Sequence, residues 1–316
     1  MKDGFNRESF GRDVVIKLLD KGIDADVRSE TVERMDGDYE SLTFVPRGKF
    51  IGACLNMNDI IRLYEDGIGY EECVDRAVEI VTDSLNNIPA IDFTNLSYDY
   101  LKGFLSIEAV SAERNREKLE KIPHKLVGDI AFIYRFVLKT DMNGRNSILV
   151  TDKILEGLEI SAEQLIHDAE EVAPVTNPLV IQDMYEVVKD LMGGLGEIMD
   201  EDEEFFKRPQ LLIATVPSKM YGAGVIAYPD FCELASEAIG GDFYLLPSSI
   251  HEVIIMPDEG DGSNLNMLKD MVRTVNATEV PPQDVLSDSV YHYDSRNKIF
   301  ELGDEFVARQ IQAAAG

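Results

Sequence analysis

The sequence has few basic residues for its length. Of its 316 residues, 30 are Lys or Arg and 59 are Asp or Glu, which gives a formal charge of −29. Nucleic-acid binding needs a Lys- and Arg-rich face that neutralises phosphates, so direct nucleic-acid binding is not expected. The acidic excess is even along the chain, with about 9, 10 and 10 negative charges in residues 1–105, 106–208 and 209–316. It indicates either a solubilising surface or one that imitates DNA or meets a basic protein partner.

Cysteine is also scarce. The three cysteines, Cys54, Cys73 and Cys232, are far apart and lack the paired spacings of a zinc site or a disulfide framework. We expect them to be reduced and mostly buried, as in a cytoplasmic protein.

Long apolar runs are missing as well. The most apolar segment, residues 131–138, is interrupted by Arg135 and is far shorter than the roughly 20 residues that a membrane-spanning helix needs. Residues 1–13 lack the apolar core of a signal peptide. We therefore expect no membrane segment and a cytoplasmic location.

Residues 210–257 carry the clearest pattern of secondary structure. Apolar runs of strand length that are closed by proline alternate here with turn residues and with one amphipathic stripe. The predicted elements are a strand at 211–216, a loop at 218–222, a strand at 224–228, a helix ending at Gly240 and Gly241, and strands at 242–246 and 250–256. This predicts a sheet of four short strands covered by one helix.

Two other segments align without a gap at an offset of 92 residues. They are IGYEECVDRAVEI at 68–80 and ISAEQLIHDAEEV at 160–172, and each follows a predicted hairpin and a short helix. With the hairpin at 211–228, they predict a hairpin-then-helix unit used about three times. The expected fold class is α/β (α+β), with such units forming mixed sheets covered by helices. The expected modules are residues 1–91, 92–200 and 201–316.

Helix boundaries are predicted from polar residues that precede apolar stripes. We expect Asn6 to cap a first helix, and Asn58 or Asp59 to cap a later one. Ser161 and Gln164 have the spacing of a capping box. A further helix is expected at 181–191.

Three stretches carry a likeness to a known family. They are GAGVIAYPDFCELASEAIGGDFYLLPSSIHEVIIMP at 222–257, VNATEVPPQDVLSDSVYHYD at 275–294 and IPHKLVGDIAFIYRFVL at 122–138. The chain resembles an uncharacterised family of gut clostridial proteins, a domain of unknown function. More distantly, it resembles a second widespread bacterial family, also uncharacterised, which has an Arg-Asp pair where this chain has Ser249 and Ile250. The resemblance implies an α/β fold and no established activity.

The first candidate for chemistry is PSSIHEV at 247–253. On a strand, Ser249 and His251 would share a face, as the nucleophile and base of a hydrolase do. The segment has no Gly-x-Ser-x-Gly elbow, and an orienting carboxylate would have to come from Asp288 or Asp294. The competing interpretation, which we favour, is that the serines form a hydrogen-bonded corner and that His251 is a half-buried structural residue.

The second candidate is a metal site. His251 with His292 and Asp294, the last two on one face of a strand, would offer two imidazoles and a carboxylate to zinc or iron. No compact ligand spacing supports this set, and YHYD at 291–294 is equally typical of an edge hairpin. We therefore expect no metal. We also expect no nucleotide or other cofactor, since GGLG at 193–196 follows no strand and carries no P-loop lysine.

Two functions follow from these observations. The first, which we prefer, is an acidic cytoplasmic binding, regulatory or accessory protein without catalysis, of the kind that mobile elements carry. The second is a hydrolase or metal-dependent enzyme centred on Ser249, His251 and His292 or Asp294. Convergence of these side chains in one pocket would favour the enzyme, and a continuous acidic face would favour the binding protein.

Overall fold

The computed structural model describes residues 5–32, 39–47, 52–86, 97–141, 144–191, 211–260 and 265–315. The chain divides into two compact units, Met1–Ile91 and Asp92–Gly316, and each is described by itself. The glycines at 193–196 lie outside the described residues. So does the predicted domain boundary at 200–201.

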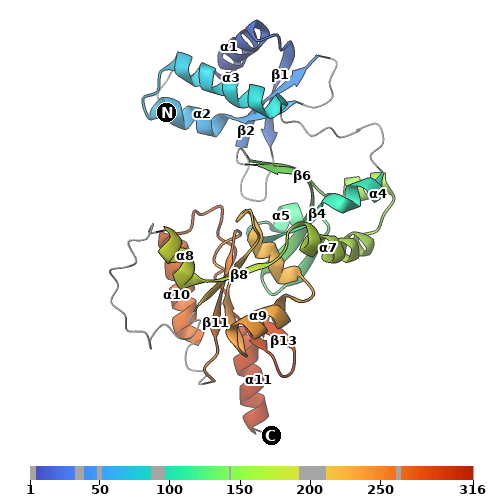
Figure 1. Ribbon diagram of the computed structural model, residues 1–316, viewed down its shortest axis with the longest axis vertical. Helices are drawn as coiled ribbons and strands as arrows, with labels where there is room; N and C mark the ends of the chain where they lie inside the picture. Colours follow the sequence, from blue (N-terminus) through green and yellow to red (C-terminus); the bar gives the residue numbers. More distant parts are fainter. Residues whose placement is uncertain are drawn as a thin grey trace. The chain divides into compact units, whose positions relative to one another are not determined.

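The small unit, Met1–Ile91, builds one antiparallel sheet with helices on one face (Figure 1). The strands pair in the order β1-β2-β3, and Leu42 and Phe44 of β2 face the helices together with Leu55 of β3. The elements are α1 (Arg7–Asp20), β1 (Ala25–Val32), β2 (Tyr39–Pro46), β3 (Ala53–Asn56), α2 (Met57–Glu65) and α3 (Tyr70–Asn86).

The helix starts in this unit follow local capping chemistry. Asn6 caps α1 as predicted, because its side-chain oxygen accepts a hydrogen bond from the Ser9 amide at 2.9 Å. The cap of α2 is Asn56, so the prediction of Asn58 or Asp59 was wrong, and the helix begins earlier than predicted. The last residue of β3 thus supplies the oxygen that accepts a hydrogen bond from the free Asn58 amide in the first turn of α2.

In the large unit, Asp92–Gly316, the described strands form two antiparallel sheets. One has the strand order β4-β6-β5, with β7 also paired to β6, and the other has the order β13-β12-β10-β11-β9-β8. The elements of its first half are α4 (Tyr98–Leu101), η1 (Lys102–Phe104), β4 (Leu105–Ser111), α5 (Arg116–Leu119), β5 (His124–Val127), β6 (Ile130–Asp141), β7 (Gly144–Leu149), α6 (Asp152–Leu158), α7 (Ala162–Thr176), β8 (Val180–Asp183) and α8 (Met184–Leu191). Those of its second half are β9 (Leu212–Thr215), η3 (Gly222–Ala227), α9 (Phe231–Ile239), β10 (Phe243–Leu246), β11 (Val253–Pro257), α10 (Leu265–Thr278), β12 (Tyr291–Asp294), β13 (Ile299–Leu302) and α11 (Gly303–Ala315).

The six-stranded sheet is covered on both faces. Phe243 and Leu245 of β10 enter a large core that is shared with the β4-β6-β5 sheet, α7 and η3. Tyr244 and Leu246, which alternate with them, pack under α10 on the other face. The α/β fold class is therefore confirmed, while the predicted sheet of four strands under one helix was too small.

The stretch at 224–228 was predicted wrongly as a strand. It belongs to the 3-10 helix η3, whose apolar residues are buried because it packs against β4 rather than because it pairs with β9. Gly224 permits this approach, since a Cβ there would lie 2.1 Å from the Ile107 carbonyl oxygen. At Gly222 a Cβ would lie 2.1 Å from the Thr215 side-chain oxygen. Apolar content alone therefore failed to distinguish a buried turn from a strand.

The third hairpin of the predicted repeat is consequently absent from 211–228, where β9 leads into η3. The first two regions share the order hairpin, short helix, long helix, which runs from β2 to α3 and from β6 to α7. Their descent from one unit stays a prediction. The helix predicted at 181–191 begins later, because β8 occupies Val180–Asp183 and pairs with β9. That pairing joins the predicted middle and C-terminal modules into one sheet.

Candidate functional site

Ser249 and His251 lie in an irregular segment between β10 and β11, and not on the strand that the sequence predicted. The Ser249 hydroxyl oxygen accepts a hydrogen bond from the backbone N–H of His251 at 3.0 Å. The segment is held by an isolated backbone bridge from Ser249 to Val285 and by a hydrogen bond from the Thr215 hydroxyl to the His251 carbonyl at 2.8 Å. These contacts form a hydrogen-bonded corner, the structural role favoured for this segment from the sequence.

The His251 ring is oriented by other groups. Its Nδ1 accepts a hydrogen bond from the Tyr221 backbone N–H at 3.1 Å, and its Nε2 lies 3.7 Å from Asp284 Oδ1. A nitrogen that accepts an N–H carries no proton, so in the neutral ring the proton is on Nε2 and faces Asp284. Neither ring nitrogen is therefore placed to take a proton from Ser249.

His292 and Asp294 share one face of β12, as predicted, but they have different partners. His292 is fully buried, and its Nε2 donates a hydrogen bond to Asp258 Oδ2 at 3.0 Å. Its ring stacks on the Phe306 ring, with the two ring centroids 3.5 Å apart. Its Nδ1 is buried without a hydrogen-bond partner among the described residues. The hydrogen bond from His292 is the main cause that lowers the pKa of Asp258 below its ordinary value.

Asp294 belongs to the turn that follows β12. It accepts hydrogen bonds from the backbone and side chain of Asn297, both at 2.9 Å, and Arg309 approaches it at 3.1 Å. Burial raises the pKa of Asp294, but these donors outweigh that effect and hold it below its ordinary value.

The candidate residues of the sequence are thus distributed over separate sets of partners. Ser249 and His251 belong to a corner near Thr215 and Tyr221, whereas His292 bonds to Asp258, and Asp294 bonds to Asn297 and Arg309. Within the described part of the chain, no group of three or more His, Cys, Asp and Glu side chains is arranged to hold a metal ion. Nucleophilic and metal chemistry consequently receive no geometric support from these four residues.

The cysteines are free thiols in different surroundings. Cys73 is buried and Cys232 half-buried, and burial raises the pKa of the Cys232 thiol to about 12. Cys54 is exposed, so the prediction of mostly buried cysteines was wrong for it. A thiol with a raised pKa forms little of the reactive thiolate, which argues against Cys232 as a nucleophile.

Four exposed acidic residues lie in a row along α3 of the small unit. The outward side of α3 carries acidic side chains at spacings of three, four and four residues, all of them exposed: Glu72, Asp75, Glu79 and Asp83. The buried side of the same helix carries Cys73, Val74, Ala77, Val78 and Val81. Ile80 is 42% exposed and does not join that side, contrary to a simple apolar stripe. Because helix positions three and four apart lie on one face, the four carboxylates make one row.

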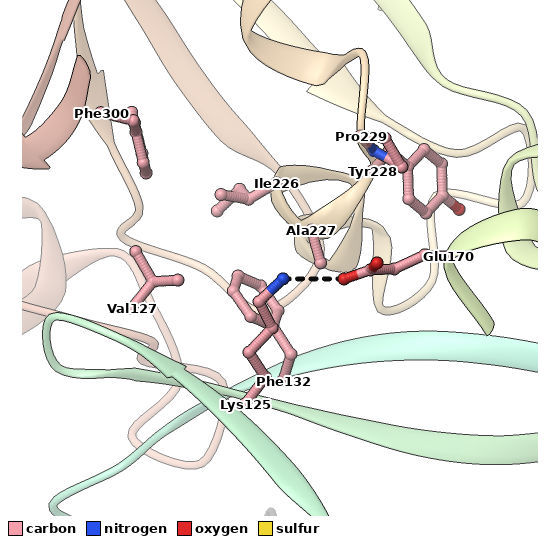
Figure 2. Close-up of a pocket in the computed structure, with 9 residues that line it drawn as sticks. All are labelled: Lys125, Val127, Phe132, Glu170, Ile226, Ala227, Tyr228, Pro229 and Phe300. Carbon is pink, nitrogen blue, oxygen red and sulfur yellow. Dashed lines mark hydrogen bonds and ion pairs between the residues drawn. The ribbon is translucent and has the colours of Figure 1, made fainter. Parts of the chain in front are cut away.

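The large unit contains a pocket that the sequence did not predict. It has a volume of about 320 Å³ and lies among β5, β6, α7, η3 and the start of β13. Its apolar wall includes Val127, Phe132, Ile226 and Phe300. Figure 2 shows Lys125 and Glu170 joined across it, with the Lys125 ammonium nitrogen 2.7 Å from Glu170 Oε1. The pocket therefore combines an apolar interior with one pair of opposite charges.

A family model described as DUF5688, a family of unknown function, matches residues 8–295. The chain belongs to this family. No curated protein and no solved structure matches it. The predicted membership in a family of unknown function is thereby confirmed, while the clostridial origin and the second, more distant family stay predictions.

Membership in DUF5688 supplies no activity, so the site must be judged from its own residues. None of the helices in the described ranges is long and apolar enough to cross a membrane. The sequence did not predict the pair of Lys125 and Glu170, because the two residues are 45 positions apart and lie in different elements. One available signal was the strand period, which places Lys125 and Val127 on the same face of β5, and both line the pocket.

Proposed function

We propose that this DUF5688 protein is a non-catalytic binding protein, and that the acidic row of α3 is the surface that contacts a basic protein partner. The proposal includes a cytoplasmic location and a regulatory or accessory role, in line with the charge and cysteine content of the sequence. The row of Glu72, Asp75, Glu79 and Asp83 is the observation that carries it.

Two properties of this row support a partner over simple solvation. The four carboxylates are aligned along one helix side, so a basic helix or peptide can meet them in succession. Among the residues that the structure describes, Asp75 is the one member of the row with an ion pair, which it forms with Lys17 of α1 at 2.6 Å. The net charge of −29 would add a long-range attraction that speeds encounter with a basic partner and weakens at high salt.

The enzymatic alternative rests on fewer observations. A hydrolase would need Ser249 facing an unprotonated nitrogen of His251, whereas Ser249 bonds to the His251 backbone. A metal enzyme would need His292 to turn a nitrogen toward other ligands, whereas its Nε2 bonds to Asp258. Both residues are better explained as parts of the scaffold.

Binding of a defined basic probe tests the proposal. We would measure the affinity of the full chain for a fluorescent lysine- and arginine-rich helical peptide, at low and at physiological salt. In the test variant, Glu72→Gln, Glu79→Gln and Asp83→Asn are combined, which leaves the ion pair of Asp75 in place. We expect this variant to bind about tenfold more weakly, since several charge contacts are lost together.

A matched variant controls for net charge. Glu113→Gln, Glu117→Gln and Glu120→Gln also remove three exposed carboxylates, but from the region of α5 in the large unit. We expect the control to keep the affinity of the parent chain. Equal weakening by both variants would show that binding follows total charge, and the assignment to α3 would be rejected. Failure of the parent chain to bind the peptide even at low salt would reject the acidic surface altogether.

A further inference from the structure

The pocket of the large unit is built by elements that are distant in sequence. Lys125 and Val127 come from β5, Phe132 from β6, and Ile226 from η3. Lys125 lies directly opposite Phe132 in the β5–β6 ladder, so its side chain leaves the sheet on the same face as this buried ring. The Lys125 ammonium group therefore lies at the edge of an apolar cavity.

The charged pair is partly sheltered from solvent. The side chains of Lys125 and Glu170 are 49% and 24% exposed, so the carboxylate lies deeper than the ammonium group. Burial, and after it the charge of Glu170, raise the pKa of the Tyr134 phenol. The aliphatic part of Lys125 can lie along the apolar wall while its ammonium group reaches Glu170.

The two opposite charges restrict the kind of ligand that fits. An anion bound to Lys125 would face the Glu170 carboxylate at close range, and a cation bound to Glu170 would face the Lys125 ammonium group. A ligand with both charges can replace the internal pair with two new pairs and leave neither charge unpaired. The apolar wall formed by Val127, Ile226 and Phe300 lies on the other side of the pocket from Glu170 in Figure 2. It would receive an uncharged body.

We propose that this pocket binds a small zwitterion with an apolar body, of the class of free α-amino acids with aliphatic or aromatic side chains. The α-carboxylate pairs with Lys125, the α-ammonium group pairs with Glu170, and the side chain enters the apolar wall. The volume of about 320 Å³ is at the small end of ligand pockets, which suits one amino acid better than a nucleotide or a peptide. This site is independent of the acidic row on α3, because the two lie in different units of the chain.

Calorimetric titration of the full chain with L-phenylalanine and L-leucine tests the ligand class. Three further probes each lack one required part: 3-phenylpropanoate has no ammonium group, 2-phenylethylamine has no carboxylate, and glycine has no apolar body. We expect at least one of the two amino acids to bind with a Kd of about 1 mM or tighter. Each incomplete probe should bind about tenfold more weakly or not at all.

Substitutions locate the binding in the pocket. Lys125→Met and Glu170→Gln each remove one charge from a partly exposed position, and each should weaken amino-acid binding about tenfold. Lys298→Met is the matched control, because Lys298 forms a similar pair with Glu233 at 2.8 Å and does not line the pocket. It should leave the affinity unchanged. Circular dichroism verifies that all three variants are folded.

Several outcomes would overturn the proposal. One is the absence of binding by both amino acids at concentrations well above 1 mM. Another is equal affinity for 3-phenylpropanoate or 2-phenylethylamine, which would mean that a single charge suffices. A third is amino-acid binding that Lys125→Met and Glu170→Gln do not change, which would place the ligand elsewhere on the chain.

Discussion

Helices α3 and α7 follow the same order of elements but have different surroundings. In the small unit, α3 packs on β3 and α1, and its buried side is entirely apolar. In the large unit, α7 lies against β4 and η1, and its buried side includes the carboxylate of Asp168 together with Leu165, Ala169 and Ala173. A shared local pattern thus produced an exposed acidic row in one case and a buried acidic residue in the other.

The difference depends on what surrounds each helix. Asp168 is 3% exposed and accepts hydrogen bonds from Lys102 and Tyr98, both at 2.6 Å, and from Gln164 at 3.2 Å. At the offset of 92 residues, the position on α3 that corresponds to Asp168 is Arg76, which is exposed. Tertiary surroundings, rather than helix pattern, therefore decide which polar residues become structural.

The largest expected effect concerns the packing of η3 against β4, the strand that α7 also contacts. Gly224→Ala would place a Cβ 2.1 Å from the Ile107 carbonyl oxygen and 2.8 Å from its carbonyl carbon, and both are backbone atoms of β4. Since a backbone cannot move aside as a side chain can, we expect a loss of about 3 kcal/mol in the free energy of unfolding. Urea denaturation measures it, and hydrogen exchange shows which unit loses protection.

Gly103→Ala is the matched control for this substitution. A Cβ at Gly103 would meet no atom within 4 Å, and the residue lies in η1 of the same unit. We expect a change within about 0.5 kcal/mol or a small gain, because alanine restricts the unfolded chain. If both alanine variants unfold at the same urea concentration, close packing of η3 on β4 is not required. Loss of hydrogen-exchange protection in the small unit after Gly224→Ala would contradict the assignment of this contact to the large unit.

The next effect concerns the buried carboxylate itself. Asp168→Ala removes the acceptor for Tyr98, Gln164 and Lys102, and Lys102 can recover some hydration because its side chain is 34% exposed. We expect the free energy of unfolding to fall by about 2 kcal/mol. Arg76→Ala, at the corresponding position of α3, should change it by less than about 0.5 kcal/mol. Equal effects in urea denaturation would mean that the two helices do not differ as the structure indicates.

Features that depend on neighbouring residues were predictable from the sequence. The Asn6 cap and the Ser161 cap, whose hydroxyl accepts from the Gln164 amide at 3.2 Å, involve residues three apart. The end of α9 at Gly240 also follows from a local property, since this residue has a φ of +92° that glycine adopts at little cost.

Features that depend on distant residues were not predictable. Gly224 could be assigned to a strand because nothing in GAGVIAY at 222–228 shows that the Ile107 backbone would lie against it. Ser249 and His251 stayed a catalytic candidate in the sequence because the actual partners of this pair, Tyr221 and Thr215, are 30 and 36 residues away from His251. The charged pair of the pocket has the same property. A site formed by contacts between separate elements leaves little trace in any single segment.

The smallest effect is a pH dependence that separates α7 from α3. Burial raises the pKa of Asp168, but the hydrogen bonds from Lys102, Tyr98 and Gln164 outweigh it, so the folded-state pKa is lowered. A lowered pKa stabilises the fold above the unfolded value of about 3.9, and this contribution is lost as the pH falls through the folded value. The difference in urea midpoint between the parent chain and Asp168→Ala should therefore be constant near neutral pH and shrink below about pH 4. A difference that stays constant or widens in acid would show that ionised Asp168 contributes nothing, and that the hydrogen bonds alone distinguish the two helices.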